Sequence, residues 1–398
     1  MTEARAGELF PMADTPASNF FRSTGLWPSQ MLRAAVNQGH EIQSAAPIGD
    51  DQIQPASLDL RLGEVAYRVR ASFLPGPGAS VRDKLDQLSM HQIDLTQGAV
   101  LEKDCVYIVP LLEHLALRRR VSALANPKSS IGRLDVFARV ITDQGTEFDR
   151  IREGYRGPLY AEISPRSFSV LARTGSRLVQ LRIRRGSPLF RDTALRRLHA
   201  EVGLVEGPAG GMPGPETIRN GLAFTVDVSG EVSGQAAEGV VGWKARRHTD
   251  VVDVDRIGHY DPQDFFEPVH VPRAGKGLHG IVLDPNDFYI LATREAVVVP
   301  PDHAAEMVPY DAFVGEFRVH FAGFFDPGFG SAEAGGVGSR AVLEVRSHEV
   351  PFLIEHGQIV GRLIYEPLIA RPDRLYGRDI GSSYQSQGLA LSKHFKRT

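Results

Sequence analysis

Cysteine is almost absent from this sequence, which has one, Cys105, among 398 residues. A single cysteine excludes a disulfide framework within the chain and a zinc site built from several thiolates, and it favours a reducing, cytoplasmic location. The sequence also lacks a run of about 18 apolar residues, and its start lacks a basic segment followed by an apolar one. We therefore expect neither a membrane span nor a signal peptide.

A strong charge of one sign is missing as well. Lys and Arg number 45 against 48 Asp and Glu, which leaves a net charge of −3. Proteins that bind bulk nucleic acid usually present a strongly basic face. Basic stretches such as RIRRG (182–186) are more often solvated surfaces, so we expect no nucleic-acid partner.

Several catalytic motifs do not occur in the sequence. The absence of GxxxxGK[ST] excludes a P-loop, and the absence of HExxH and GxSxG excludes a zincin site and a nucleophile elbow. The zinc deaminase signature needs paired cysteines, which a chain with one cysteine does not have. We therefore expect no zinc site of these two kinds.

What the chain does have is many short runs with a β-strand pattern, separated by Gly, Pro and Asp. This pattern is typical of an all-β sandwich or barrel, here with minor helices. Residues 1–18 are expected to be a disordered lead, and the Gly/Pro-rich stretch 203–217 is expected to be a linker. The clearest strand candidates are 56–63, 105–111, 136–142, 159–164 and 177–183.

The strand pattern repeats along the chain with a constant offset of 182 residues. LEKDCVYIV at 101–109 matches LDPNDFYIL at 283–291, and Glu162 in YAEIS matches Glu344 in VLEVR. A third segment, TGSRLVQLRI, matches HGQIVGRLIY at the same offset. A constant offset over three segments predicts two tandem copies of one β-domain.

The two copies are predicted to span residues 1–202 and 218–398, on either side of the linker. An upstream match pairs Asp59 with Asp227. The copies differ in one polar segment, because PKSSIGR at 127–133 faces PYDAFVG in the second copy, which has neither the serines nor the arginine.

The segment PKSSIGR concentrates hydrogen-bond donors on one short turn. Lys128, Ser129, Ser130 and Arg133, together with backbone N–H groups near Gly132, could surround an oxyanion. Polyphosphate is a natural ligand for such a turn, because charge-assisted bonds to phosphate are strong and directional. On spacing alone, a polar β-turn with surface charges is an equally good interpretation.

Glu162 and Glu344 each interrupt an apolar strand pattern. Such a carboxylate either points outward by strand alternation or lies in a pocket. In a pocket, desolvation raises its pKa and suits it to proton transfer near neutral pH. The pattern alone favours the outward position.

Several motifs, in this order along the chain, resemble the dCTP deaminases, which are relatives of the trimeric dUTPases. In the second copy the matching motifs are AGFFDPGF (322–329), VLEV (342–345) and IVGRLIYEPL (359–368). The motifs of the first copy and the tail are QPASLDLRLG (54–63), PKSSIGRL (127–134), GYRGPLYAEI (154–163) and LYGRDIGSSYQSQG (375–388).

The resemblance implies a fold, a reaction and an assembly. The fold is two tandem dUTPase-like distorted β-barrels of jelly-roll type, with sites between barrels and a C-terminal lid. The reaction is hydrolysis of dCTP to dUTP and ammonia, which feeds dUMP and dTTP synthesis, with Mg²⁺ on the triphosphate and no metal at the base. The expected assembly is a homotrimer.

The resemblance also assigns roles residue by residue. The catalytic groups are Ser129, Arg133 and a strand glutamate, either Glu162 or Glu344, which carries a proton from water to N3 and then to ammonia. The expected substrate-binding residues are Lys128, Ser130, Gln180, Ala322, Asp326, Tyr384 and Gln387.

Each copy departs from the family pattern. In the first copy DPGF has become REGY (152–155), so its sugar-binding Asp is lost or displaced to Asp149, and the second copy lacks the serine turn. We therefore predict a composite site, in which the serine turn faces Asp326 and Glu344. The rival arrangement joins Glu162 to the serine turn of another first copy.

Two other functions stay open at this stage. One is dUTP hydrolysis, alone or after deamination, although Arg152 and Glu153 occupy the turn where those enzymes place the water-activating Asp. The other is a non-catalytic nucleotide sensor. The retained serine turn, glutamates and lid argue against the sensor.

Overall fold

The computed structural model describes eleven stretches of the chain. The predicted disordered lead, the centre of the predicted linker (207–216), Ala322 and residues 310–315 lie outside the described residues. The described stretches are 22–187, 191–206, 217–230, 239–270, 280–309, 317–319, 323–347, 349–377, 380–381, 384–385 and 387–397.

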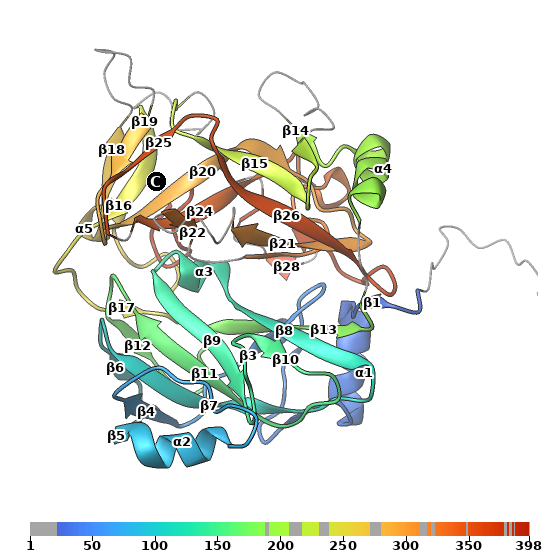
Figure 1. Ribbon diagram of the computed structural model, residues 1–398, viewed down its shortest axis with the longest axis vertical. Helices are drawn as coiled ribbons and strands as arrows, with labels where there is room; N and C mark the ends of the chain where they lie inside the picture. The colour runs from blue at the N-terminus through green and yellow to red at the C-terminus, as the bar shows by residue number, and fades with distance from the viewer. Residues whose placement is uncertain are drawn as a thin grey trace, which may run out of the picture.

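The first copy is built from two main sheets and fills the lower half of Figure 1. One sheet runs in the order β1-β13-β8-β10, with β3 also on β13; its strands are β1 (Gly25–Leu26), β3 (Leu58–Leu60), β8 (Val121–Pro127), β10 (Arg150–Ile151) and β13 (Val179–Arg185). The other runs β5-β4-β7-β11-β9, with β2 on β7; its strands are β2 (Ile42–Ser44), β4 (Val65–Val69), β5 (Ser89–Asp94), β7 (Val106–Ala116), β9 (Val136–Thr142) and β11 (Arg156–Pro165). All five strand candidates of the sequence coincide with one of these strands.

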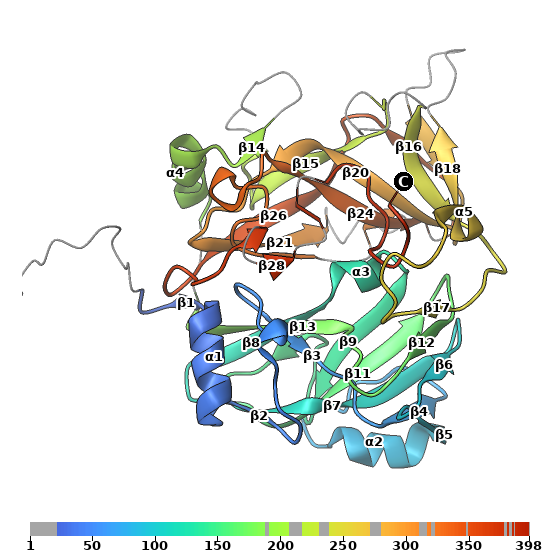
Figure 2. The same ribbon diagram turned by 180° about the vertical axis from the view of Figure 1, so that it is seen from behind.

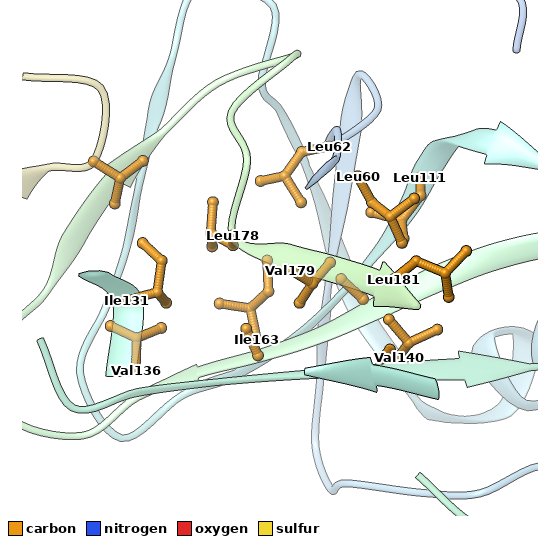
Figure 3. Packing of buried hydrophobic residues seen from close by; sticks show 14 of the residues in the cluster. Leu60, Leu62, Leu111, Ile131, Val136, Val140, Ile163, Leu178, Val179 and Leu181 are labelled. Atoms are coloured by element: carbon orange, nitrogen blue, oxygen red, sulfur yellow. The ribbon is translucent and has the colours of Figure 1, made fainter. Parts of the chain in front are cut away.

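The core of the first copy lies between its two sheets. Figure 3 shows Val179 and Leu181 from one sheet close to Val140 and Ile163 from the other. All four side chains are buried and belong to one apolar cluster. Burial of this apolar surface is the main favourable term that holds the two sheets together.

The second copy is built around one large sheet, in the upper half of Figure 1. Its main path is β18-β16-β20-β15-β26-β21-β23, with β14, β22 and β24 attached to it. The strands are β14 (Val205–Glu206), β15 (Leu222–Asp227), β16 (Val240–Ala245), β18 (Phe266–His270), β20 (Phe288–Val297), β21 (His303–Pro309), β22 (Phe317–Val319), β23 (Phe324–Phe325), β24 (Ser339–Ser347) and β26 (Ile359–Pro367).

The remaining elements are short. None of the helices in the described part of the chain is long and apolar enough to cross a bilayer. The small strands are β6 (Ala99–Leu101), β12 (Val170–Ala172), β17 (Val252–Asp253), β19 (Gly280–Leu283), β25 (Phe352–Glu355), β27 (Tyr376–Gly377) and β28 (Ile380–Gly381). The helices are α1 (Ser29–Gln38), α2 (Val81–Leu88), α3 (Ser129–Gly132), α4 (Asp192–Val202) and α5 (Pro262–Phe265), with 3₁₀ turns η1 (Asp50–Gln52) and η4 (Ala332–Ala334).

Strand pairing confirms the tandem repeat. Glu162 lies opposite Ile108, and Glu344 lies opposite Ile290, so both partners shift by the same 182 residues (344 − 162 and 290 − 108). The pairing of β6 with β12 recurs in the pairing of β19 with β25 at the same offset. The fold is therefore all-β with minor helices, as predicted, and consists of two related β-domains.

The upstream match of Asp59 with Asp227 is wrong by four residues. The Leu62 N–H donates to the Ser176 carbonyl at 3.0 Å, and the Val226 N–H makes the same bond, also at 3.0 Å, to a carbonyl 182 residues further along. Leu62 therefore corresponds to Val226, and Asp59 corresponds to Ala223. Asp59 thus has no acidic counterpart in the second copy.

Helix α4 and the residues after it pack on the second copy. Leu195 of α4 belongs to the second apolar cluster, together with Leu204 and Val205. Residues 205–206 form β14, which pairs with β20, although the Gly/Pro content predicts a linker from residue 203. The apolar pair Leu204 and Val205 gains more by burial on the second core than the flanking glycines cost.

The two copies share a continuous apolar core, and Figure 2 shows them in direct contact. Phe168 of the first copy meets Phe265 and Phe266 of the second edge to face, with ring centroids 5.5 and 5.3 Å apart. Strand β12 also pairs in parallel with β17 of the second copy. This interface fixes the distance between groups that the two copies present to each other.

Candidate active site

A cavity of about 600 Å³ opens where the two copies and the C-terminal segment meet. Its walls bring together nine of the residues that the sequence analysis singled out. These residues are Lys128, Ser129, Ser130, Arg133, Gln180, Asp326, Glu344, Tyr384 and Gln387. Glu162 does not line the cavity.

The serine turn is a short helical segment, α3, that follows the end of β8. The Lys128 carbonyl accepts hydrogen bonds from the N–H groups of Ile131 and Gly132, at 2.8 and 3.0 Å. Ile131 is buried in the core of the first copy, where Figure 3 shows it beside Val136. The turn is therefore anchored from below by an apolar side chain, while its polar residues line the cavity.

Lys128 forms an ion pair with Asp59 of β3. Asp59 lies opposite Gln180 of β13, and Gln180 in turn lies opposite Asn126 of β8. One oxygen of Asp59 is buried without a hydrogen-bond partner in the described structure. The sequence alone does not reveal this role of Asp59, because its partner Lys128 is 69 residues away in the chain.

Arg133 connects the first copy to the second copy and to the C-terminal segment. Its Nε atom lies 3.8 Å from Oε1 of Glu344, and its guanidinium stacks over the Tyr384 ring at 3.9 Å. Nη1 donates to Oε1 of Gln387 and to the Ala390 carbonyl, both at 3.0 Å. The arginine is 3% exposed, so these interactions take place away from bulk water.

The C-terminal segment is held against the second copy as well. Gln387 Nε2 donates to the Arg340 carbonyl at 3.0 Å, and the Lys393 N–H donates to the Tyr384 hydroxyl at 3.0 Å. Ser392 donates its hydroxyl proton to the Ser130 carbonyl at 2.7 Å. The segment therefore closes one side of the cavity and touches the serine turn directly.

Glu344 lies on β24 and is 4% exposed. Burial raises the pKa of Glu344 to about 7, the Arg133 guanidinium opposes this rise, and the Asp135 carboxylate adds to it. A carboxyl with a pKa near neutrality can accept and return a proton at physiological pH. Of the two strand glutamates, Glu344 is the one that combines this property with a place in the cavity.

Arg182 is a site residue that the sequence analysis missed, since the RIRRG stretch looked like a solvated surface. The structure shows Arg182 2% exposed, and Nη2 donates to the Asp326 carboxylate at 3.0 Å. Arg182 also donates to the carbonyls of Ala305 and Phe325 and stacks over the Phe324 ring at 4.0 Å. The strand β13 faces the second copy here instead of water, which sequence periodicity does not reveal.

Asp326 is held by this arginine at the cavity wall. Burial raises the pKa of Asp326, and the Arg182 guanidinium opposes the rise. In the first copy, strand pairing puts Arg152 in the equivalent place, because Ile151 pairs with Ala123 as Phe325 pairs with Ala305. The first copy has therefore lost the acid at this position.

Glu162 lies in a closed ion pair outside the cavity. Arg139, its neighbour across β9 and β11, binds one carboxylate oxygen, and Ser72 donates its hydroxyl proton to the other at 2.7 Å. Arg139 also stacks on the Phe148 ring at 3.7 Å. Within one chain, the serine turn therefore meets Glu344 and not Glu162.

Comparison with known proteins identifies the family of both copies. A family model described as the 2′-deoxycytidine 5′-triphosphate deaminase (DCD) N-terminal domain matches residues 23–187, and the corresponding C-terminal domain model matches residues 191–395. The boundary between these models places α4 in the second domain.

The chain is also similar to a solved structure and to a curated protein. The crystal structure of 2′-deoxycytidine 5′-triphosphate deaminase from Agrobacterium tumefaciens is 54% identical, with a TM-score of 0.80 over 87% of this chain and 100% of that one. A "dCTP deaminase, dUMP-forming" from Halobacterium salinarum is 34% identical over 110 residues, 27% of this chain and 52% of that protein, so the match spans about half of the curated relative. With both domain models and this structural similarity, the chain belongs to the dCTP deaminase family.

Proposed function

We propose that this protein hydrolyses the amino group of dCTP and releases dUTP and ammonia. The observation that carries the proposal is the contact of Arg133 with Glu344, in a cavity whose rim holds a turn rich in cationic and hydroxyl groups. A buried carboxyl with a pKa near 7 beside a guanidinium suits proton transfer to a neutral ring. Family membership supports the same reaction.

The reaction needs a proton carrier. Ionised Glu344 takes a proton from water while the water oxygen bonds to C4 of the cytosine ring. Glu344 then passes this proton to N3. The tetrahedral carbon then expels ammonia, which takes its third hydrogen from the water hydroxyl through Glu344. Arg133 and the Ser129 hydroxyl lie at the cavity wall to stabilise charge that develops around C4.

The remaining cavity residues fit the sugar and the triphosphate. Lys128 and Ser130 provide a cation and a hydroxyl for phosphate oxygens, and Asp326 provides an acceptor for a sugar hydroxyl. Tyr384 and Gln387 close the site from the C-terminal side. Gln180 lies between Asp59 and Asn126 on the floor formed by β13.

Magnesium is expected to enter with the triphosphate. Mg²⁺ in phosphate sites keeps several waters and uses one or two carboxylates besides phosphate oxygens. Asp59 fits this requirement, because one of its buried oxygens has no hydrogen-bond partner. Clusters of three or more His, Cys, Asp or Glu that could hold a metal do not occur among the described residues. When bound, the ion would neutralise phosphate charge.

A second candidate is deamination followed by hydrolysis to dUMP, which the name of the Halobacterium salinarum relative favours. Asp149 is the nearest aspartate before GYRG. Its Oδ1 accepts a hydrogen bond from the Val140 N–H at 2.7 Å, and burial raises its pKa to about 7. Because Asp149 does not line the cavity, we place dUMP formation second.

The test is one assay with dCTP and magnesium in which ammonia, dUTP, dUMP and pyrophosphate are all quantified. Equal amounts of ammonia and dUTP support the proposal. Pyrophosphate and dUMP in amounts equal to ammonia support the second candidate, and tight dCTP binding without ammonia supports a nucleotide sensor. A homotrimeric assembly, a cytoplasmic location and the absence of a nucleic-acid partner remain predictions.

A further inference from the structure

Two ion pairs join the serine turn and the residues after it to β24, and the signs of the charges are reversed between them. Arg133 faces Glu344, and two residues further along both segments Asp135 binds Arg346. Residues two apart on a strand point to the same side, so Glu344 and Arg346 face the same surface of the first copy. Each copy therefore gives one cation and one anion to the contact.

Asp135 is held rigidly by the turn. It is fully buried, and its backbone has a φ of 56°, in the left-handed region that Asp tolerates better than most residues. Its N–H donates to the Gly132 carbonyl at 2.8 Å, and its carbonyl accepts from the Arg166 N–H at 2.9 Å. Ser167 donates its hydroxyl proton to the carboxylate at 2.7 Å.

Arg346, on β24 of the second copy, is also held by several hydrogen bonds. It is 7% exposed and donates to the Asn286 carbonyl as well as to Asp135. Nη2 also lies 3.3 Å from the Ser167 hydroxyl. A buried pair of this kind contributes little net stability, but separating its partners is costly, because each charge would then be buried without compensation.

We propose that Asp135 and Arg346 are positioning residues for the reaction: their ion pair fixes the serine turn, and with it Arg133, against β24 and Glu344. The inference rests on the proposed function. Neither residue lines the cavity, so both act through Glu344 and the turn.

The charges around Glu344 give the direction of the effect. The charged groups that face Glu344 are Arg133 and Asp135, of which Arg133 lowers its pKa and Asp135 raises it. Burial raises the pKa of Asp135, and the charged groups that face it, Arg346 and Arg166, oppose this rise. Removal of the Asp135 charge therefore lowers the pKa of Glu344.

The experiment compares the pH dependence of kcat/KM for ammonia release from dCTP in the wild type and in Asp135→Asn. We expect the acid limb of the variant to lie at least about 0.3 pH unit lower, so that its rate at pH 6 relative to pH 8 is about twofold higher than in the wild type. A profile that superimposes on that of the wild type overturns the proposal, even if the variant melts at a lower temperature.

A second variant covers the case in which Asp135→Asn does not fold. Asp135→Asn/Arg346→Gln removes both charges and leaves no uncompensated ion in the interface. Its acid limb is expected to move in the same direction as that of Asp135→Asn but by less, because a cation on the same strand face as Glu344 is removed too. The matched control is Asp253→Asn, which breaks the Arg173–Asp253 pair between the same two copies. The acid limb of its pH profile should coincide with that of the wild type. A displacement equal to that of Asp135→Asn contradicts a specific role for Asp135.

Failure of the inference is distinguishable from failure of the proposed function. If the wild-type protein releases no ammonia from dCTP, the proposed function is wrong. If the wild type deaminates dCTP and neither Asp135 variant shifts the limb, only the positioning role is wrong.

Discussion

The Nε atom of Arg133 lies 3.8 Å from Oε1 of Glu344, although one residue belongs to the first copy and the other to the second. Both side chains are almost fully buried. The charged form of the glutamate is thus disfavoured by burial and favoured by the guanidinium, and burial has the larger effect. This balance places the proton affinity of Glu344 near physiological pH.

The first prediction concerns the pH dependence of the reaction. Because the pKa of Glu344 is about 7 and the base must be ionised, kcat/KM for dCTP should fall about tenfold per unit as the pH decreases below 7. The measurement is ammonia release between pH 5 and 9. A rate that stays constant down to pH 5 contradicts a base with a raised pKa.

A second prediction concerns stability. The folded-state pKa of Glu344 is raised from 4.5 to about 7, so its protonation stabilises the fold fully below pH 4.5, and this contribution is lost as the pH rises through 7. Glu344→Gln removes the cost of the buried charge. Its melting temperature relative to that of the wild type should therefore be higher at pH 8 than at pH 5, and a constant difference across this range would refute the assigned titration.

Arg182 gives a third prediction. Arg182→Met removes a buried cation that binds Asp326 and two carbonyl groups, and it should destabilise the protein by about 3–5 kcal/mol. The control is Arg184→Met on the same strand, whose partly exposed pair with Glu366 should be worth about 1 kcal/mol or less. Thermal and denaturant unfolding measure the loss of stability in both variants. Equal losses would contradict the larger contribution that we assign to the buried Arg182.

Lys128 gives a fourth prediction. In the proposed function Lys128 binds phosphate in the ground state and the transition state alike, so for Lys128→Met the KM for dCTP should rise about tenfold or more with kcat nearly unchanged. Lys103, which is exposed and outside the cavity, provides the control variant Lys103→Met. A loss in kcat with unchanged KM would mean that Lys128 acts on the reacting ring instead.

The β-strands and the repeat could be predicted from the sequence because both depend on local pattern. Alternation and turn residues mark the strands, and the offset between Glu162 and Glu344 recurs in the strand pairing. The serine turn was visible as an unusual local density of donors. The prediction that residues 203–206 belong to a linker was wrong, because Leu204 and Val205 are buried by residues far along the chain.

The partners in the site could not be predicted from the sequence. Arg182 and Arg346 look like outward charges on strands, and each is buried only because a strand of one copy lies on the other copy. The choice between Glu162 and Glu344 also depends on this contact. Both glutamates lie in the same local sequence pattern. However, Glu162 forms an ion pair with Arg139, whereas Glu344 contacts Arg133 of the serine turn.

The central claim is that a single chain builds the site from the serine turn of its first copy and Glu344 of its second. The most direct test measures ammonia release from dCTP by Glu344→Gln and Glu162→Gln, two identical changes at equivalent positions of the repeat. Glu344→Gln should lose about 100-fold or more in kcat, and Glu162→Gln should retain the activity of the wild type. Loss of activity in Glu162→Gln, with Glu344→Gln still active, would contradict the composite site.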